Sequence, residues 1–305
     1  MPGDPRPWNP KDWEHRIQLL LKRRYPPGQY QHVPDTVRGD LGIEGFALDG
    51  TAYQCYAAQE CVTASELLTK QKNKMTADIG KFKSNGAKLA ELLGTLKISV
   101  WNFLVPYWND KDLINHATKK AQELAALDLS HVASQFRITI LTQDDFAVEA
   151  QLLANVNLIK FDVPVPQVAP KKLAEWMEQK TNLELVDNLH RKAEVLARGK
   201  SREQKELLQA RIVANYIGGN VVLGRLEREL PETYAKIANY KAGKEANLEA
   251  ESVITNKVPA EFFDQTLQQY RKELAAVPGI GPAAANTLAW EAVSDWVLRC
   301  PMRFD

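Results

Sequence analysis

Apolar positions in the first half of the chain change between helical and strand spacing. Residues 12–25 repeat apolar side chains three and four residues apart, which predicts a helix with Asp12 as its cap. The same spacing predicts helices over residues 64–93, 111–127 and 144–154. Two short, continuous apolar runs, ISVWNFLVP and FRITILT, have the length of buried strands.

Between the first two helices, the segments GIEGFAL and TAYQCYA flank the dipeptide Asp49-Gly50. An Asp-Gly turn between two strand-like segments predicts a β-hairpin. The predicted order is therefore helix, hairpin, helix, strand, helix, strand. Helices that alternate with fully apolar strands predict an α/β domain over residues 1–160, with a mixed sheet, flanking helices and near-parallel later strands.

The segment FDVPVPQVAP contains three prolines in ten residues and marks the predicted domain boundary. Beyond it, residues 161–305 show no strand pattern and predict an all-α domain. The predicted helices span residues 171–198, 201–229, 232–251, 261–274 and 283–299. The apolar positions around Ile217 and Val221 have two interpretations, a core helix or a face that assembles protein partner subunits.

Length and composition limit the number of domains, the kinds of partner and the cellular compartment that we expect. A length of 305 residues suggests about two domains, and the net charge of +1 means that DNA binding would need local basic patches. Three unpatterned cysteines predict neither a disulfide framework nor structural zinc, and favour a reducing cytoplasm. No apolar stretch approaches the roughly 18 residues of a membrane span, so no membrane partner is expected. Nucleotide-binding glycine loops and zinc-hydrolase histidine pairs are also absent from the sequence.

The hairpin collects polar residues that suit metal chemistry. Cleavage of a phosphodiester by Mg²⁺ needs carboxylates to hold the ion and a cation near the phosphate. Side chains two apart on a strand share a face, so Gln54 and Tyr56 lie on one face of the second strand. Asp40 and Glu44 precede and begin the first strand, and Glu14 of the first helix could approach from one side. The pattern predicts a metal site at the hairpin.

These residues resemble the PD-(D/E)xK restriction-endonuclease-like superfamily, particularly its Mrr-type branch. That branch carries a helical Glu, a G-D-x-G-h-D/E segment and h-Q-C-K on the adjacent strand. The corresponding segments here are Trp13-Glu14, Gly39-Asp40-Leu41-Gly42-Ile43-Glu44 and Tyr53-Gln54-Cys55-Tyr56. The resemblance covers about residues 11–150 and implies a restriction-endonuclease-like fold for that part.

The resemblance implies a Mg²⁺- or Mn²⁺-dependent DNA endonuclease, as part of a bacterial restriction or anti-phage defence system. By it, Glu44 binds the metal, Gln54 is a second ligand through its carbonyl, and Asp40 and Glu14 assist. Tyr56 departs from the pattern, because a phenol lacks the positive charge of the superfamily lysine. The following helix offers Lys72 and Lys74 as catalytic cations and Lys70 as a DNA contact. The alternative is a catalytically inactive adaptor that binds DNA or a partner protein.

Residues 274–290 match a helix-hairpin-helix pattern. In that motif, a turn such as Gly279-Ile280-Gly281 directs backbone N–H groups at a DNA phosphate. A plain tight turn between two packed helices explains the same residues equally well.

Overall fold

The computed structural model describes residues 7–34, 41–60, 63–299 and 302. The chain forms two compact units, Met1–Ala150 and Gln151–Asp305. The division falls within α5 (Ala147–Asn155), upstream of the proline-rich segment where sequence alone places the boundary.

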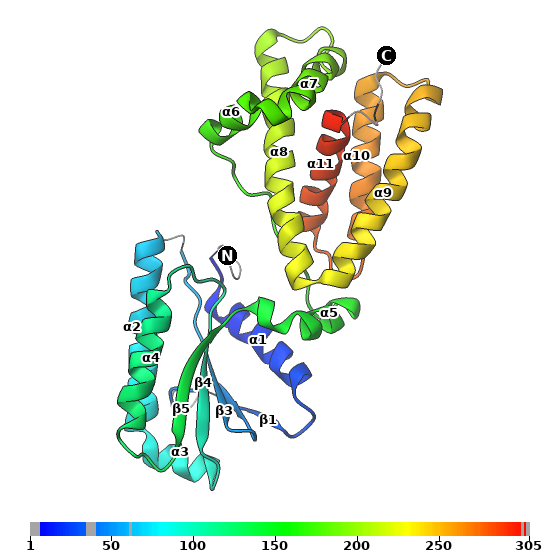
Figure 1. Cartoon of the computed structure of the whole chain (residues 1–305). Coiled ribbons are helices and arrows are strands. Elements are labelled where there is room, and N and C mark those ends of the chain that lie inside the picture. Colours follow the sequence, from blue (N-terminus) through cyan, green and yellow to red (C-terminus); the bar gives the residue numbers. More distant parts are fainter. Residues whose placement is uncertain (1–6, 35–40, 61–62, 300–301, 303–305) are drawn as a thin grey trace. The chain divides into compact units, whose positions relative to one another are not determined.

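The first unit contains a mixed five-stranded sheet with helices packed against it (Figure 1). Its helices are α1 (Pro10–Arg24), α2 (Ala64–Ser84), α3 (Gly86–Leu93), α4 (Asp112–Ala125) and the 3-10 helix η1 (Gln143–Phe146). Its strands are β1 (Tyr30–His32), β2 (Gly45–Ala47), β3 (Thr51–Cys55), β4 (Ile98–Leu104) and β5 (Val132–Leu141). The strand order follows the sequence. The pairs β1–β2 and β2–β3 are antiparallel, and β3–β4 and β4–β5 are parallel, which confirms the predicted mixed α/β sheet.

Three local details differ from the sequence predictions. Asn9, not Asp12, caps α1, because its side-chain oxygen accepts hydrogen bonds from the backbone N–H groups of residues 11 and 12. The helix expected over residues 64–93 is interrupted at Asn85, whose side-chain amide donates to the Lys81 carbonyl. Strand β1 was not expected, because a three-residue YQH segment has no apolar run.

The sheet buries aromatic residues against α2 and α4. Trp101 and Phe103 of β4 belong to a cluster with Met75 and Phe82 of α2. On α1, the buried Trp13 donates its indole N–H to the Leu104 carbonyl at 3.1 Å. Helices α1 and α2 therefore both contact β4, the strand that pairs with β3 of the hairpin.

The second unit is helical in its described residues (Figure 1). After α5 it contains α6 (Pro170–Glu178), the 3-10 helix η2 (Lys180–Asn182), α7 (Leu183–Leu196), α8 (Arg202–Glu229), α9 (Pro231–Ile254), α10 (Pro259–Ala275) and α11 (Pro282–Arg299). The prediction of an all-α region is confirmed at this level. The single helix expected over residues 171–198 is divided by η2. Within the described ranges, the helices include none that is both long and apolar enough to cross a membrane.

Candidate functional site

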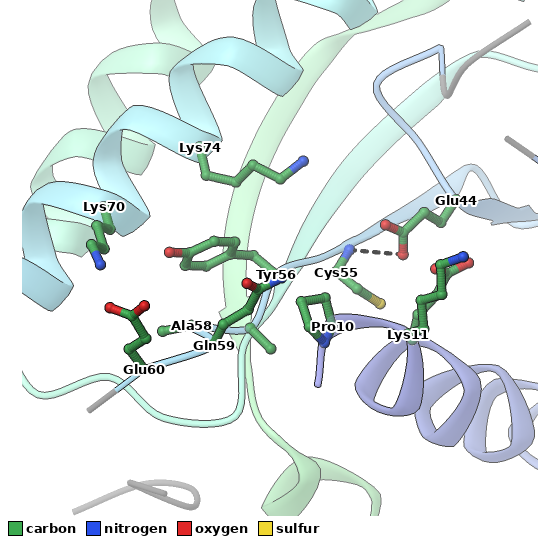
Figure 2. Close-up of a pocket in the computed structure, with 12 residues that line it drawn as sticks. Pro10, Lys11, Glu44, Cys55, Tyr56, Ala58, Gln59, Glu60, Lys70 and Lys74 are labelled. Carbon is green, nitrogen blue, oxygen red and sulfur yellow. Dashed lines mark hydrogen bonds between the residues drawn. The ribbon is translucent and has the colours of Figure 1, made fainter. Parts of the chain in front are cut away.

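Residues of α1, of the hairpin and the segment after it, and of α2 line an open cavity of about 610 Å³ in the first unit. Figure 2 shows Lys70 and Lys74 on the α2 side, Glu44 and Cys55 on the hairpin side, and Tyr56 between them. The residues that line the cavity are Pro10, Lys11, Glu14, Glu44, Cys55, Tyr56, Ala57, Ala58, Gln59, Glu60, Lys70 and Lys74. Five of the residues predicted from sequence therefore share one pocket: Glu14, Glu44, Tyr56, Lys70 and Lys74.

Glu44 stands just before β2, with its carboxylate bonded to β3. One oxygen accepts a hydrogen bond from the Cys55 backbone N–H at 3.1 Å, which Figure 2 shows as a dashed line. The other accepts from the Gln54 side-chain amide at 3.1 Å. Burial raises the pKa of Glu44 to about 8; the Cys55 hydrogen bond opposes this shift and the nearby Glu14 charge adds to it. The pocket thus holds a carboxyl group that is costly to ionise without a cation.

Gln54 is fully buried and does not line the pocket. Its amide donates to Glu44, so it holds that carboxylate in place. The sequence predicted Gln54 as a metal ligand, but a side chain with this placement is not presented to the cavity. The physical reason is that Gln54 lies on a central strand whose side chains are covered by helices.

Glu14 reaches the pocket from α1. One of its carboxylate oxygens lies 3.7 Å from His32 Nε2 of β1. Its charge also contributes to the raised pKa of Glu44, which indicates that the two carboxylates lie near each other. The approach of a helical acid to the hairpin acid agrees with the prediction for this pair.

Tyr56 follows β3 and stands where the resemblance expects lysine. Its ring is nearly parallel to that of Phe103, with 6.2 Å between centroids and 8° between planes. Burial raises the pKa of the phenol, so Tyr56 carries no charge near neutral pH. The residue brings an aromatic surface to the pocket and no cation.

Two lysines of α2 bring positive charge to the pocket. Lys74 Nζ lies 2.6 Å from an oxygen of the fully buried Asp78, one helical turn away. The charge of Lys74 opposes the raised pKa values of both Glu44 and Cys55, which indicates that it acts across the pocket on the hairpin. Lys70 is exposed and lines the same wall.

One lysine that the sequence predicts for the site does not join this group. Lys72 does not line the pocket, and its charge acts on His116 of α4, since the helical rotation of two residues from Lys70 turns it away. The prediction that Lys72 supplies the catalytic cation therefore has no support in this arrangement. Asp40 lies outside the described residues.

The glycine turn of the second unit is bonded within its own chain. Gly279 N–H donates to the Asn157 side-chain oxygen at 3.1 Å, and Gly281 N–H donates to the Phe161 carbonyl at 2.9 Å. The side chain of Asp162 accepts from the next two amides, those of residues 283 and 284. These amides are directed at internal acceptors, which argues against phosphate binding at Gly279 and Gly281 and favours the tight-turn interpretation.

The pocket carries charges of both signs. Its lining includes the cations Lys11, Lys70 and Lys74 and the carboxyl groups of Glu14, Glu44 and Glu60. Among residues that the structure describes, no cluster of three or more His, Cys, Asp or Glu side chains is arranged to hold a metal ion. Lys11, Cys55 and Glu60 were not predicted from sequence, although Cys55 sits inside the quoted motif. Comparisons of the chain with protein-family models, with curated proteins and with solved structures find no significant match.

Proposed function

We propose that the first unit is a metal-dependent nuclease domain that hydrolyses phosphodiester bonds in DNA. The observation that carries the proposal is the meeting of two carboxyl groups, Glu14 and Glu44, with two lysines of α2 in one open pocket. Acids that hold a divalent ion beside cations that hold a phosphate are the requirements of this reaction. The order from α1 to β4, a helix, three antiparallel strands, two helices and a strand, also supports restriction-endonuclease-like ancestry.

The number of carboxylates in the pocket fits Mg²⁺ or Mn²⁺. Mg²⁺ is commonly held by one or two protein carboxylates and completes its shell with water and substrate phosphate. Glu44 and Glu14 would supply those carboxylates, while Gln54 would keep Glu44 oriented. When bound, the ion would lower the pKa of a water molecule and polarise the phosphate.

Lys74 takes the role that the resemblance gives to the strand lysine. Its ammonium is held by Asp78, which limits its rotation, and its charge reaches Glu44. Lys70 would contact a neighbouring phosphate at the exposed rim. In this proposal the catalytic cation comes from a helix rather than from the strand, and Tyr56 takes no part in the hydrolysis.

The wider setting is also part of the proposal. The helical second unit would bind partner subunits of a bacterial restriction or anti-phage system in the cytoplasm. Val221 of α8 is 56% exposed, so the face that sequence singled out includes at least one accessible apolar side chain. The alternative is an adaptor whose pocket binds DNA without cutting it.

Plasmid and linear DNA cleavage in Mg²⁺ and in Mn²⁺ tests the proposal. Wild-type protein should cut, and Glu44→Ala should lower the rate at least about 100-fold, because loss of a metal ligand removes several kcal/mol of transition-state stabilisation. Lys74→Ala should also impair cutting, whereas Lys72→Ala is the matched control from the same helix and should cut normally. If wild type and Glu44→Ala are equally inactive yet bind DNA alike, the adaptor alternative replaces the nuclease.

A further inference from the structure

Tyr56 ends a row of parallel aromatic rings at the pocket. Trp101 and Phe103 are stacked with 5.9 Å between centroids and 9° between planes. Phe103 and Tyr56 continue the arrangement at 6.2 Å and 8°. The first two rings are fully buried, whereas Tyr56 is partly exposed and lines the cavity. The core therefore fixes the orientation of the one ring of this row that a ligand can reach.

Two lysines beside this ring suit the phosphate groups of a nucleic acid. Lys70 and Lys74 stand on the α2 wall beside Tyr56, as Figure 2 shows. Positive side chains next to an aromatic surface are the combination by which proteins bind single-stranded nucleic acid, the charges to phosphates and the ring to a base. The uncharged phenol does not repel a phosphate held by those lysines. The cavity volume of about 610 Å³ lies within the range of roughly 300–1,000 Å³ usual for ligand pockets.

We infer that the pocket stacks an unpaired nucleobase on Tyr56, so that the substrate is single-stranded or locally unpaired DNA. A base inside a duplex has both faces covered by its neighbours and can stack on a side chain only after leaving the helix. This substrate class rests on the proposed nuclease function for cleavage, while the stacking itself is measured by binding. The aromatic replacement at the lysine position thereby acquires a role in substrate selection.

The test is equilibrium binding of the full chain without divalent metal, in EDTA, to a fluorescent oligonucleotide as a single strand and as a blunt duplex. We expect the single strand to bind more tightly. Tyr56→Phe, which keeps the ring, should retain that preference, whereas Tyr56→Leu should weaken single-strand binding about tenfold and leave duplex binding nearly unchanged. The fluorescence of a 2-aminopurine base in the strand should be quenched on binding to wild type or to Tyr56→Phe, but not on binding to Tyr56→Leu.

Controls separate stacking from folding and from catalysis. Thermal melts of both Tyr56 variants show whether each is folded. Equal single-strand binding by Tyr56→Leu and Tyr56→Phe, or a preference of wild type for duplex, overturns the inference. If cleavage needs Glu44 but base stacking is absent, the nuclease stands and the inference falls. If stacking needs Tyr56 but no metal supports cleavage, the binding site stands and the nuclease falls.

Discussion

At the scale of single residues, Glu44 makes the stability of the fold sensitive to pH. Burial raises its pKa from 4.5 to about 8, so the folded state prefers the protonated form. Stability from this group is fully present below about pH 4.5 and is lost as the pH rises through about 8. At about 1.36 kcal/mol per pKa unit the loss is on the order of a few kcal/mol.

Glu44→Gln tests this coupling. The substitution removes the ionisable group, so the free energy of unfolding of the variant relative to wild type should increase from about pH 5 to about pH 9. Urea unfolding at several pH values measures the difference, and Glu60→Gln is the control because it removes a carboxyl group from the exposed rim of the same pocket. Parallel pH profiles for wild type and Glu44→Gln would contradict the assigned burial. Added Mg²⁺ should reduce the loss of stability at high pH in wild type but should have no such effect on Glu44→Gln.

Residue identity within the quoted motif predicted which side chains gather, but not what each one does. Glu44 and Glu14 were predicted from their types and positions, and both reach the pocket. Gln54 was assigned a ligand role, but its side chain is buried, does not line the pocket and donates to Glu44. Spacing along a strand says which side chains share a face, whereas the packing of helices decides whether that face is accessible.

At the scale of elements, the position of α2 relative to the hairpin depends on a glycine. Gly42 has a φ of +84°, and a Cβ there would lie 2.4 Å from the Asp78 carbonyl oxygen and 2.6 Å from the Phe82 nitrogen, both in the backbone of α2. Trp101 also donates its indole N–H to the Gly42 carbonyl at 2.9 Å. This close approach brings Lys74 of α2 within electrostatic reach of Glu44.

Gly42→Ala should therefore displace α2 and impair both stability and cleavage. Gly28 is the matched control, since it has the same φ of +84° but a Cβ added there would meet nothing within 4 Å. We expect Gly28→Ala to cost about 1–2 kcal/mol from backbone strain alone, and Gly42→Ala to cost more because backbone atoms must move. Thermal or urea unfolding measures both. Equal losses for the two variants would show that the loop and α2 separate easily.

At the scale of the whole molecule, a buried charge network joins helices α9 and α11 of the second unit. Lys241 of α9 lies 2.7 Å from Glu291 and 2.8 Å from Asp295, both of α11. Burial opposes the charge of Lys241, but the two carboxylates outweigh it and raise the pKa of the lysine. Burial also raises the pKa of Glu291. Removing the lysine would leave the buried Glu291 without its bonded cation, whereas Asp295 would keep its ion pair with Arg299 at 2.5 Å.

Lys241→Met should destabilise the chain by about 3–5 kcal/mol near neutral pH, the usual cost of breaking a buried ion pair from one side. The loss should shrink toward about pH 4, because Glu291, left without its lysine, can then take up a proton. Lys236→Met is the control, as it changes an exposed lysine of the same helix. A loss as small as that of the control, or one independent of pH, would show that water already screens the network.

The sequence by itself determined the periodic elements, the turn at Asp49-Gly50 and the residue types at the hairpin, because these depend on neighbours in the chain. Tertiary structure decided which of them form a site. Packing buried Gln54, turned Lys72 toward His116 and directed the Gly279 amide to Asn157. Accessibility and hydrogen-bond partners depend on residues distant in the chain, and no local pattern encodes them.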